Sequence, residues 1–259
     1  MKKTVLVTGA YGAIGKAIAR QLVERGIYTM LVGRDEVKLQ KAVEEIIRQT
    51  GKKDVHYRVV DLSRKKNIYD FSSGWKGELD ILINNACTAP RRGTETPEGI
   101  EMQFATNVLG YFWMIDAFRG FMKASEDARI INVASYWAGG MDLNDPEFKK
   151  RRYDNNDAYR QSKQADRMLT VAFADRLLST GITVNSCHPG DVNSKVSNDL
   201  GFGGHESPDQ GAATPVWLAT DPGLKSVTGK YFADKSLVHC SFSEDIEGIE
   251  RLYSLCKSY

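Results

Sequence analysis

The residues that are most clearly suited to acid/base chemistry are Tyr159 and Lys163, which lie four positions apart. On a helix this spacing puts both side chains on one face, one turn apart. A free phenol has a pKa of about 10, and an ammonium fixed beside it favours the phenolate and lowers that pKa. The pair therefore predicts that Tyr159 is a general acid/base whose pKa is lowered by Lys163.

The same spacing occurs twice more, so it does not identify the site alone: Tyr231 with Lys235, and Tyr253 with Lys257. The first of these pairs follows a predicted turn into a short strand, in which side chains four positions apart are widely separated. The second lies in a predicted terminal helix, where we expect a surface or dimer-contact role. Only Tyr159 opens a long predicted helix behind polar residues, 154–157, that can cap it.

The composition bounds the class of protein. The chain has 259 residues and a net charge of +2, which allows a sizeable core and argues against binding nucleic acid or a membrane surface through bulk charge. The cysteines are widely separated and predict neither a disulfide framework nor a metal site: Cys87, Cys187, Cys240 and Cys256. The apolar run Thr4–Val7 is too short for a signal peptide and no span is long enough to cross a membrane, so a cytoplasmic location is expected.

Apolar segments of strand length alternate with longer segments of helical periodicity along most of the chain. The predicted strands are Thr4–Thr8, Tyr28–Val32, Val55–Val60, Leu79–Ile83, Arg129–Ala134 and Thr183–Cys187, followed by the short strand at Tyr231. The predicted helices are Lys16–Arg25, Glu36–Gln49, Lys65–Trp75, Glu98–Lys123, Ala158–Leu178 and Ile246–Ser258. This alternation predicts one α/β domain over residues 1–259, a doubly wound parallel sheet of about seven strands with helices on both faces.

Two segments interrupt this alternation, and long loops in compact domains are often functional. We expect an inserted loop at residues 137–156 and a substrate lid at residues 191–208. Hydrophobic side chains in these segments can line an apolar, closable pocket: Trp137, Met141, Leu143, Phe148, Tyr153 and Phe202. The same side chains can equally pack on the body of the protein or at a dimer contact.

A glycine turn joins the first predicted strand to the first predicted helix. Such a turn lets the backbone approach a pyrophosphate and directs helix N–H groups toward it. The residues that we expect to bind a nucleotide here are Gly9, Tyr11, Gly12, Ala13, Ile14 and Gly15. A tight connection between strand and helix, without a ligand, is the alternative.

The end of the second predicted strand bears on the choice of cofactor. Sites for NAD place an acidic residue here to bind the ribose 2′-hydroxyl, whereas a 2′-phosphate favours arginine. This chain has Gly33 at the acidic position, followed by Arg34 and Asp35, so we expect NADP(H) to be preferred over NAD(H). Alternatively Arg34 is a solvated turn residue, and Asp35 can cap the next helix in either case. Lys16 is either a second phosphate contact or a surface charge.

These residues and several further motifs together resemble the short-chain dehydrogenase/reductase superfamily over nearly the whole chain. The matching residues are Thr8–Gly15, Asp61-Leu62, Asn84-Asn85-Ala86, the tetrad Asn107, Ser135, Tyr159 and Lys163, and His188-Pro189-Gly190. Segments 104–110 and 228–232, together with the long interval from Ser135 to Tyr159, are most similar to the retinol dehydrogenase and protochlorophyllide reductase-like branch, whose members generally prefer NADP(H). The resemblance implies a Rossmann fold and an oxidoreductase.

The resemblance also implies roles for individual residues. Tyr159 exchanges the proton, Lys163 lowers its pKa and holds the nicotinamide ribose, and Ser135 binds the substrate oxygen. Asn107 anchors a water that relays protons to Lys163, and His188 shapes the turn beside the nicotinamide. The cofactor contacts implied beyond the glycine turn and Arg34 are Asp61, Leu62, Asn84, Ala86, Tyr159, Lys163, Pro189, Gly190, Val192 and Ser194.

The expected function is hydride transfer between NADP(H) and the carbonyl or alcohol group of a hydrophobic small molecule. The two long helices are the usual dimer faces of this family, so a homodimer or homotetramer is one possible assembly. Vertebrate retinol dehydrogenases often carry an N-terminal membrane anchor. We do not expect such an anchor here, which argues against retinol as the specific substrate.

The chain departs from the family at the glycine turn, where Ala13 replaces the usual middle glycine. The resulting spacing of Gly9, Gly12 and Gly15 is closer to the extended branch of epimerases and dehydratases, although the stretch after Pro189 is short for the substrate domain of that branch. Cys87 replaces another usual glycine, and we expect it to be a small core residue. The alternatives to a reductase are therefore an extended-type epimerase or dehydratase, and a non-catalytic scaffold that senses NADP(H). The intact tetrad argues against the scaffold.

Overall fold

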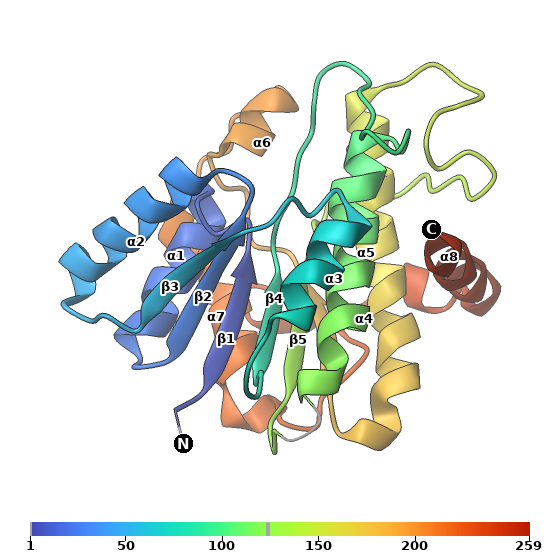
Figure 1. Cartoon of the computed structure of the whole chain (residues 1–259). Coiled ribbons are helices and arrows are strands. Elements are labelled where there is room, and N and C mark those ends of the chain that lie inside the picture. The colour runs from blue at the N-terminus through green and yellow to red at the C-terminus, as the bar shows by residue number, and fades with distance from the viewer. Residues whose placement is uncertain (1, 123–124) are drawn as a thin grey trace.

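The computed structural model describes residues 2–122 and 125–259, and within them eight strands form one continuous sheet (Figure 1). The strand order is β3-β2-β1-β4-β5-β6-β7-β8, in which β8 alone runs antiparallel to its neighbour. The strands are β1 Thr4–Thr8, β2 Tyr28–Gly33, β3 Val55–Val59, β4 Ile81–Asn84, β5 Arg129–Val133, β6 Thr183–Cys187, β7 Tyr231–Ala233 and β8 Ser236–Val238. The predicted parallel α/β sheet is confirmed, with one antiparallel edge strand beyond the seven expected.

Helices cover both faces of this sheet (Figure 1). They are α1 Ala13–Glu24, α2 Glu36–Thr50, α3 Lys65–Ser73, α4 Gly110–Met122, α5 Asn155–Leu177, α6 Lys195–Asp199, α7 Pro208–Thr220 and α8 Ile246–Ser258. Successive side chains of a strand point to opposite faces. Val5 and Val7 of β1 therefore pack with α1, α2 and α7, while Leu6 packs in the core formed with α3, α4 and α5.

Capping residues set the ends of the two helices that matter most for the site. The carboxylate of Asp35 accepts a hydrogen bond from the first turn of α2, and Gly51, at φ 69°, ends that helix in the left-handed conformation. The carboxylate of Asp154 accepts two backbone hydrogen bonds from the first turn of α5. Because of this cap, α5 begins three residues before Ala158, the predicted start.

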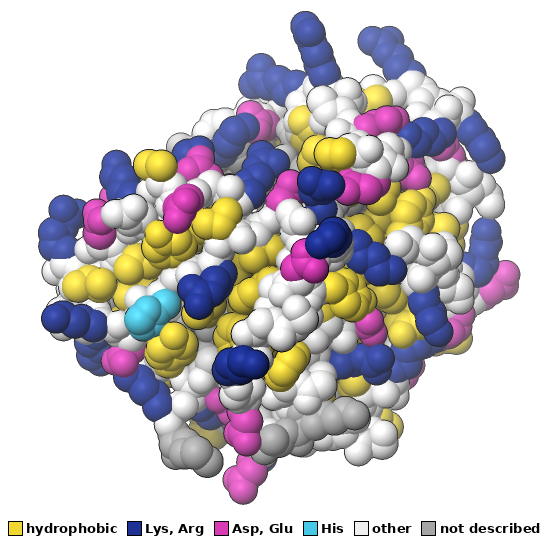
Figure 2. All heavy atoms as spheres, in the orientation of Figure 1, with side chains coloured by type: hydrophobic (Ala, Val, Ile, Leu, Met, Phe, Trp, Pro, Cys, Tyr) yellow, Lys and Arg dark blue, Asp and Glu magenta, His cyan; other side chains and the backbone are white. Residues whose placement is uncertain are grey.

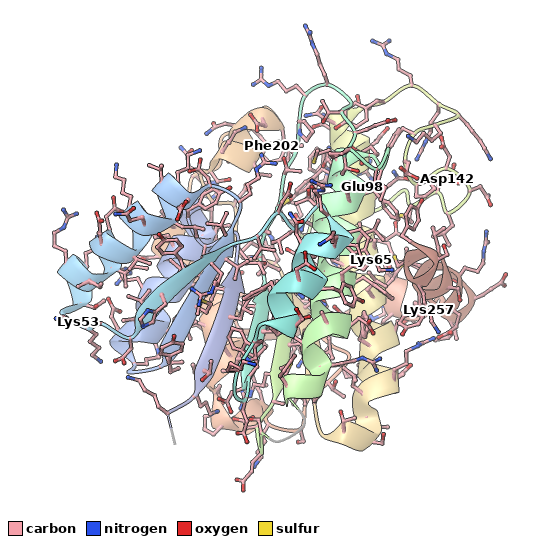
Figure 3. The ribbon with its side chains drawn as sticks, viewed as in Figure 1. Lys53, Lys65, Glu98, Asp142, Phe202 and Lys257 are labelled. Atoms are coloured by element: carbon pink, nitrogen blue, oxygen red, sulfur yellow. The ribbon has the colours of Figure 1, made fainter. Side chains whose placement is uncertain are left out.

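The helix predicted from Glu98 begins later than expected. Gly99 has φ 79°, which is incompatible with a helix interior. The side chain of Glu98 instead pairs with Arg64, at the start of α3, with 2.8 Å between nitrogen and oxygen (Figure 3). The carboxylate of Glu101 then accepts hydrogen bonds from the next backbone N–H groups, at 2.9 and 2.7 Å, and starts the helix.

The first part of this helix is a π-helix, Phe104–Leu109, which continues into α4. Gly110 stands at the junction, where an added Cβ would lie 2.8 Å from the carbonyl oxygen of Leu62. The helix therefore passes close to the segment that follows β3. The predicted last residue, Lys123, lies outside the described residues.

Helices α6 and α7 were not predicted. α6 lies inside the expected lid, 191–208, and the Ser194 hydroxyl caps it. α7 begins with a capping box in which Ser207 and Gln210 exchange side-chain and backbone hydrogen bonds. The pattern Ser-Pro-x-Gln is a signal for this start, but Pro215 within the helix obscures its continuation.

Helix α8 packs against the outer side of α4 and α5. Its buried face consists of Gly248, Ile249, Leu252 and Cys256. The Tyr253 ring lies 5.2 Å from the ring of Phe112 and 5.4 Å from that of Phe173, and the Arg176 guanidinium lies 3.7 Å above it. Tyr253 is thus half-buried against the chain itself, and its expected surface or dimer-contact role stays a prediction.

Charged side chains of both signs are interspersed over the face shown in Figure 2, in keeping with the small net charge. Within residues 2–122 and 125–259, no helix combines the length and the hydropathy that crossing a membrane requires.

Leu252→Ala tests whether α8 is part of the core. Leu252 is fully buried, so removing its side chain is expected to lower the free energy of unfolding by about 2–5 kcal/mol in urea titrations. Ile246→Ala is the matched control on the same helix. Ile246 is 61% exposed, so we expect a change within about 0.5 kcal/mol. Equal effects of the two substitutions would contradict the packing described here.

Candidate active site

One cavity of about 500 Å³ opens at the carboxyl ends of the parallel strands, where ligands bind in such sheets. It collects residues from the turns after β1, β2, β3, β4, β5 and β6. Every residue predicted to contact the cofactor lines it except Asn84. The glycine turn and the tyrosine and lysine of α5 therefore face one space.

The glycine turn requires glycine because the backbones approach closely. Gly9 has φ 63°, and an added Cβ would lie 2.7 Å from Cα of Ala86. A Cβ on Gly15 would lie 2.6 Å from the Asn85 amide nitrogen. Ala13 is tolerated because it is the first residue of α1, where a side chain has room. No side chain caps α1, so the N–H groups of its first turn remain available to an anion.

Two cationic side chains lie at the end of β2, and there is no room for an acidic side chain at position 33. A Cβ on Gly33 would lie 2.5 Å from the Tyr11 ring, so this ring occupies the space of an acidic side chain. Arg34 and Lys38 both line the cavity. Lys38 was missed by the sequence analysis, although it lies one helical turn beyond Arg34.

Lys16, by contrast, does not line the cavity. Its ammonium lies 2.6 Å from the Glu45 carboxylate on α2. The second cation that lines this part of the cavity is therefore Lys38, whose ammonium also lies 2.8 Å from the Asp35 carboxylate, whereas Lys16 is a surface charge paired outside the cavity.

Asn84, the last residue of β4, and the adjacent Asn85 lie in different surroundings. Asn84 is fully buried and donates a hydrogen bond to the Asn132 side chain on β5 at 3.0 Å. Asn85 lines the cavity, and its amide donates to the carbonyl oxygen of Thr8 at 2.9 Å. Alternation along the strand end turns Asn84 inward, so its expected place in the cofactor site was wrong.

Three of the four predicted tetrad residues meet in the cavity. Tyr159 and Lys163 project from α5, and the Lys163 Nζ atom lies 5.9 Å from the centroid of the Tyr159 ring. Ser135 follows β5, and its hydroxyl accepts a hydrogen bond from the backbone N–H of Trp137 at 3.1 Å. The tyrosine, lysine and serine are thus held by two adjacent elements.

Asn107, the fourth residue, is buried outside the cavity in the π-helix. Its side chain pairs with the Thr88 backbone, accepting from N–H at 2.9 Å and donating to the carbonyl at 3.0 Å. It also donates to the Ser162 hydroxyl at 3.1 Å. Asn107 therefore links the segment after β4 to α5. Its expected role through water stays a prediction.

Burial dominates the acidity of Tyr159. The pKa of Tyr159 is raised to about 12, chiefly by loss of solvation and further by Cys87, while Lys163 and the Ser135 hydroxyl act to lower it. The net pKa of Tyr159 is therefore raised rather than lowered in the described structure. Lys163 acts in the expected direction but is outweighed by desolvation.

Two residues of α5 that support the site were missed. The Asp166 carboxylate lies 2.8 Å from the ammonium of Lys163. The Arg167 guanidinium donates to the carbonyl oxygen of Ser135 and, at 2.7 Å, to the Tyr231 hydroxyl. Asp166 follows Lys163 by three positions, a spacing that places both on one helix face and was visible in the sequence.

His188 sits beside the cavity as a neutral side chain. Burial lowers its pKa to about 4, and its ring meets the Tyr136 ring edge-on at 4.8 Å. A histidine that is uncharged throughout the neutral range and packed in this way suits the predicted role of shaping the turn.

The outer part of the cavity is aromatic. The rings of Trp137 and Phe202 meet edge to face at 5.1 Å, and Phe202 lies beside α6 (Figure 3). The α6 segment is attached across the opening, because Arg91 donates to the carbonyl of Asn198 at 3.1 Å and Asn155 donates to that of Asp199 at 3.2 Å.

Four of the hydrophobic residues proposed for the pocket lie elsewhere. Met141 and Leu143 pack against the core on the α5 side of the sheet, and Phe148 packs against Tyr153 at 5.6 Å. For these four the packing alternative holds. The part of the chain that the structure describes contains no cluster of side chains suited to a metal ion.

Comparison with known proteins agrees with this geometry. A family model described as short chain dehydrogenase matches residues 3–201. Human retinol dehydrogenase 13 is 35% identical over 273 residues, which cover 97% of this chain and 82% of that protein. The expected resemblance to the retinol dehydrogenase branch is confirmed.

Two solved structures extend the comparison. An uncharacterized protein from Mycobacterium Paratuberculosis superposes with a TM-score of 0.84 at 26% identity, covering 99% of this chain and 92% of that chain. A metagenomic short-chain oxidoreductase in complex with NADP gives a TM-score of 0.68, also at 26% identity, covering 89% and 95%.

The acidity of His188 can be measured directly. We expect its ring-proton NMR signal to titrate near pH 4, because burial disfavours the charged ring. The signal is assigned by its disappearance in His188→Asn. A midpoint close to the ordinary value of about 6.5 would contradict the neutral, structural role.

Proposed function

Because the chain belongs to the short-chain dehydrogenase family, we propose that it is an NADP(H)-dependent oxidoreductase that interconverts a carbonyl and an alcohol, with Tyr159 as general acid/base. The observation that carries this proposal is the shared cavity. Tyr159, Lys163 and Ser135 face the same space as the uncapped first turn of α1 and Arg34. A proton donor, a cation and a nucleotide-sized anion site thus lie within one cavity.

The bound nicotinamide cofactor supplies or accepts the hydride. The protein handles the proton and the substrate oxygen. Ser135 would hydrogen-bond that oxygen, and Tyr159 would give it a proton during reduction or take one during oxidation. The raised pKa leaves the proton on Tyr159 at neutral pH, which is the form that can protonate a substrate oxygen.

Residues at the end of β2 support a preference for NADP(H). Arg34 and Lys38 offer positive charge to a 2′-phosphate, and arginine suits phosphate because its planar group makes paired hydrogen bonds. Tyr11 fills the space over Gly33 where an acidic residue would bind the 2′-hydroxyl of NAD. The first turn of α1 would hold the pyrophosphate.

The aromatic outer cavity supports a hydrophobic aldehyde or ketone as substrate. Trp137 and Phe202 form its walls, with Tyr136, Val196 and Leu200 also lining it. Relatives named retinol dehydrogenases fit this chemistry. The cavity therefore favours apolar carbonyl compounds over sugars, which need many polar partners.

Tyr159→Phe tests the proposed proton transfer. NADPH consumption with a panel of aliphatic and aromatic aldehydes, ketones and quinones is expected to fall at least ~100-fold, because the substitution keeps the ring and removes the proton. Tyr253→Phe is the matched control, since Tyr253 has the same spacing to a lysine on α8 and should leave activity unchanged. If neither the native protein nor the variant reacts while NADPH still binds, the sensing scaffold replaces the reductase.

Arg34→Gln tests the cofactor preference. The loss of a charged contact to the 2′-phosphate is expected to weaken NADPH binding by about tenfold or more and to leave NADH binding within about twofold. Fluorescence titration of each cofactor measures both affinities. Arg48→Gln removes an equal charge from an exposed position of α2 and serves as control. Equal losses for NADPH and NADH would count against the proposed role of Arg34.

A further inference from the structure

Lys163 carries its charge in a place that is almost without solvent. Its side chain is 2% exposed, and that of Asp166 is fully buried. The ammonium donates to the carbonyl oxygen of Val133 at 3.0 Å and to Asp166 at 2.8 Å. Burying a lysine without a partner lowers its pKa by as much as ~3–5 units, so this ammonium requires compensation.

The other titratable groups around this pair come from every packed element. They are Cys87 after β4, Tyr111 on α4, Tyr159 on α5, Cys187 on β6 and Cys256 on α8. Burial raises the pKa of each of them, so all are neutral near pH 7. Among these neighbours in the described chain, Asp166 is the only carboxylate.

We propose that Asp166 is a positioning residue for the reaction: it is the counter-ion that keeps Lys163 protonated and its ammonium next to Tyr159. This inference rests on the proposed function, because the role that it gives to the Lys163 charge is to adjust the proton exchange of Tyr159. Asp166 faces neither substrate nor cofactor, since it lies outside the cavity behind Lys163.

The hydrogen bond of the Asp166 side chain in the described structure is made to Lys163. One carboxylate oxygen binds Lys163, and the other is buried without a hydrogen-bond partner in the described structure. Burial lowers the pKa of Lys163, and Asp166 is the largest influence that raises it. Burial likewise raises the pKa of Asp166, to about 7, and Lys163 is the influence that lowers it, so each charge of the pair depends on the other. No other group shares the charge of Asp166 through a hydrogen bond.

A chain of buried hydrogen bonds fixes the helical turn that carries Asp166. The Thr170 hydroxyl donates to the carbonyl oxygen of Asp166 at 2.7 Å and accepts from the Asn132 amide at 2.9 Å. Asn132 in turn accepts from Asn84 at 3.0 Å. This connection to β5 and β4 gives Asn84 a structural use in place of the expected cofactor contact.

Asp166→Asn tests the proposal because it removes the charge and keeps the shape. In protein labelled with carbon-13 at lysine Cε, free of cofactor, the Lys163 signal is assigned by its loss in Lys163→Arg. We expect native Lys163 to stay protonated to about pH 10 and the titration midpoint in Asp166→Asn to fall by at least ~2 units. Reductase activity of the variant should drop at least ~10-fold relative to native between about pH 6 and pH 9 as Lys163 loses its proton.

Two further variants make the result specific. Asp175→Asn removes the same charge from an exposed position of α5 and should change neither the Lys163 signal nor the pH profile. Asp166→Glu restores the charge and should return the Lys163 midpoint toward the native value. If Asp166→Asn does not fold, the titration of Lys163 in the native protein and in the Asp166→Glu variant still tests the proposal.

A native Lys163 that titrates below about pH 9 would overturn the proposal, because the counter-ion would then fail to hold the proton. So would a Lys163 signal and a pH profile that are unchanged in Asp166→Asn, or an alkaline loss of activity that moves to higher pH in that variant. Full activity of Tyr159→Phe would instead remove the proposed function and leave the NMR result standing.

Discussion

The ammonium of Lys163 is the charge on which this site depends. In a nearly dry position it persists only where acceptors are fixed beside it. Val133 at the end of β5 offers its carbonyl oxygen, and Asp166, one turn along α5, offers its carboxylate. The strand and the helix must therefore stay in register, and the buried hydrogen bonds that connect β4, β5 and α5 hold that register.

The second requirement is close approach of backbones at the other end of the cavity. Gly9 and Gly15 leave no room for a side chain against the segment after β4. That contact aims the first turn of α1 into the space that Tyr159 faces from α5. Both ends depend on parallel strands whose carboxyl ends lie together. The sheet thus brings the first turn of α1 and the Tyr159 side chain into one cavity, although they are far apart in sequence.

Much of this could be predicted from local pattern. The bounds of β1, β6 and α8 were correct to the residue. β1 is a short apolar run between two threonines, and Asp245 caps the start of α8. Predictions failed where the role of a residue depends on the direction in which its side chain points. Asn84 and Asn85 are adjacent, and only the end of β4 determines which faces the cavity. Met141 and Leu143 look like pocket residues by composition, yet they pack on the core.

The sequence by itself determined the fold class, the family and the choice of Tyr159 over the other tyrosines with a lysine four positions on. The fold class rests on periodicity and turn chemistry, and the choice of Tyr159 on spacing and helix capping, which are local properties. The family rests on the resemblance of ordered motifs along the chain. Only the tertiary structure decided the balance of charge at the site. Desolvation and the pairing of Lys163 with Asp166 depend on how completely separate elements exclude water, and exclusion of water is a property of the packed molecule.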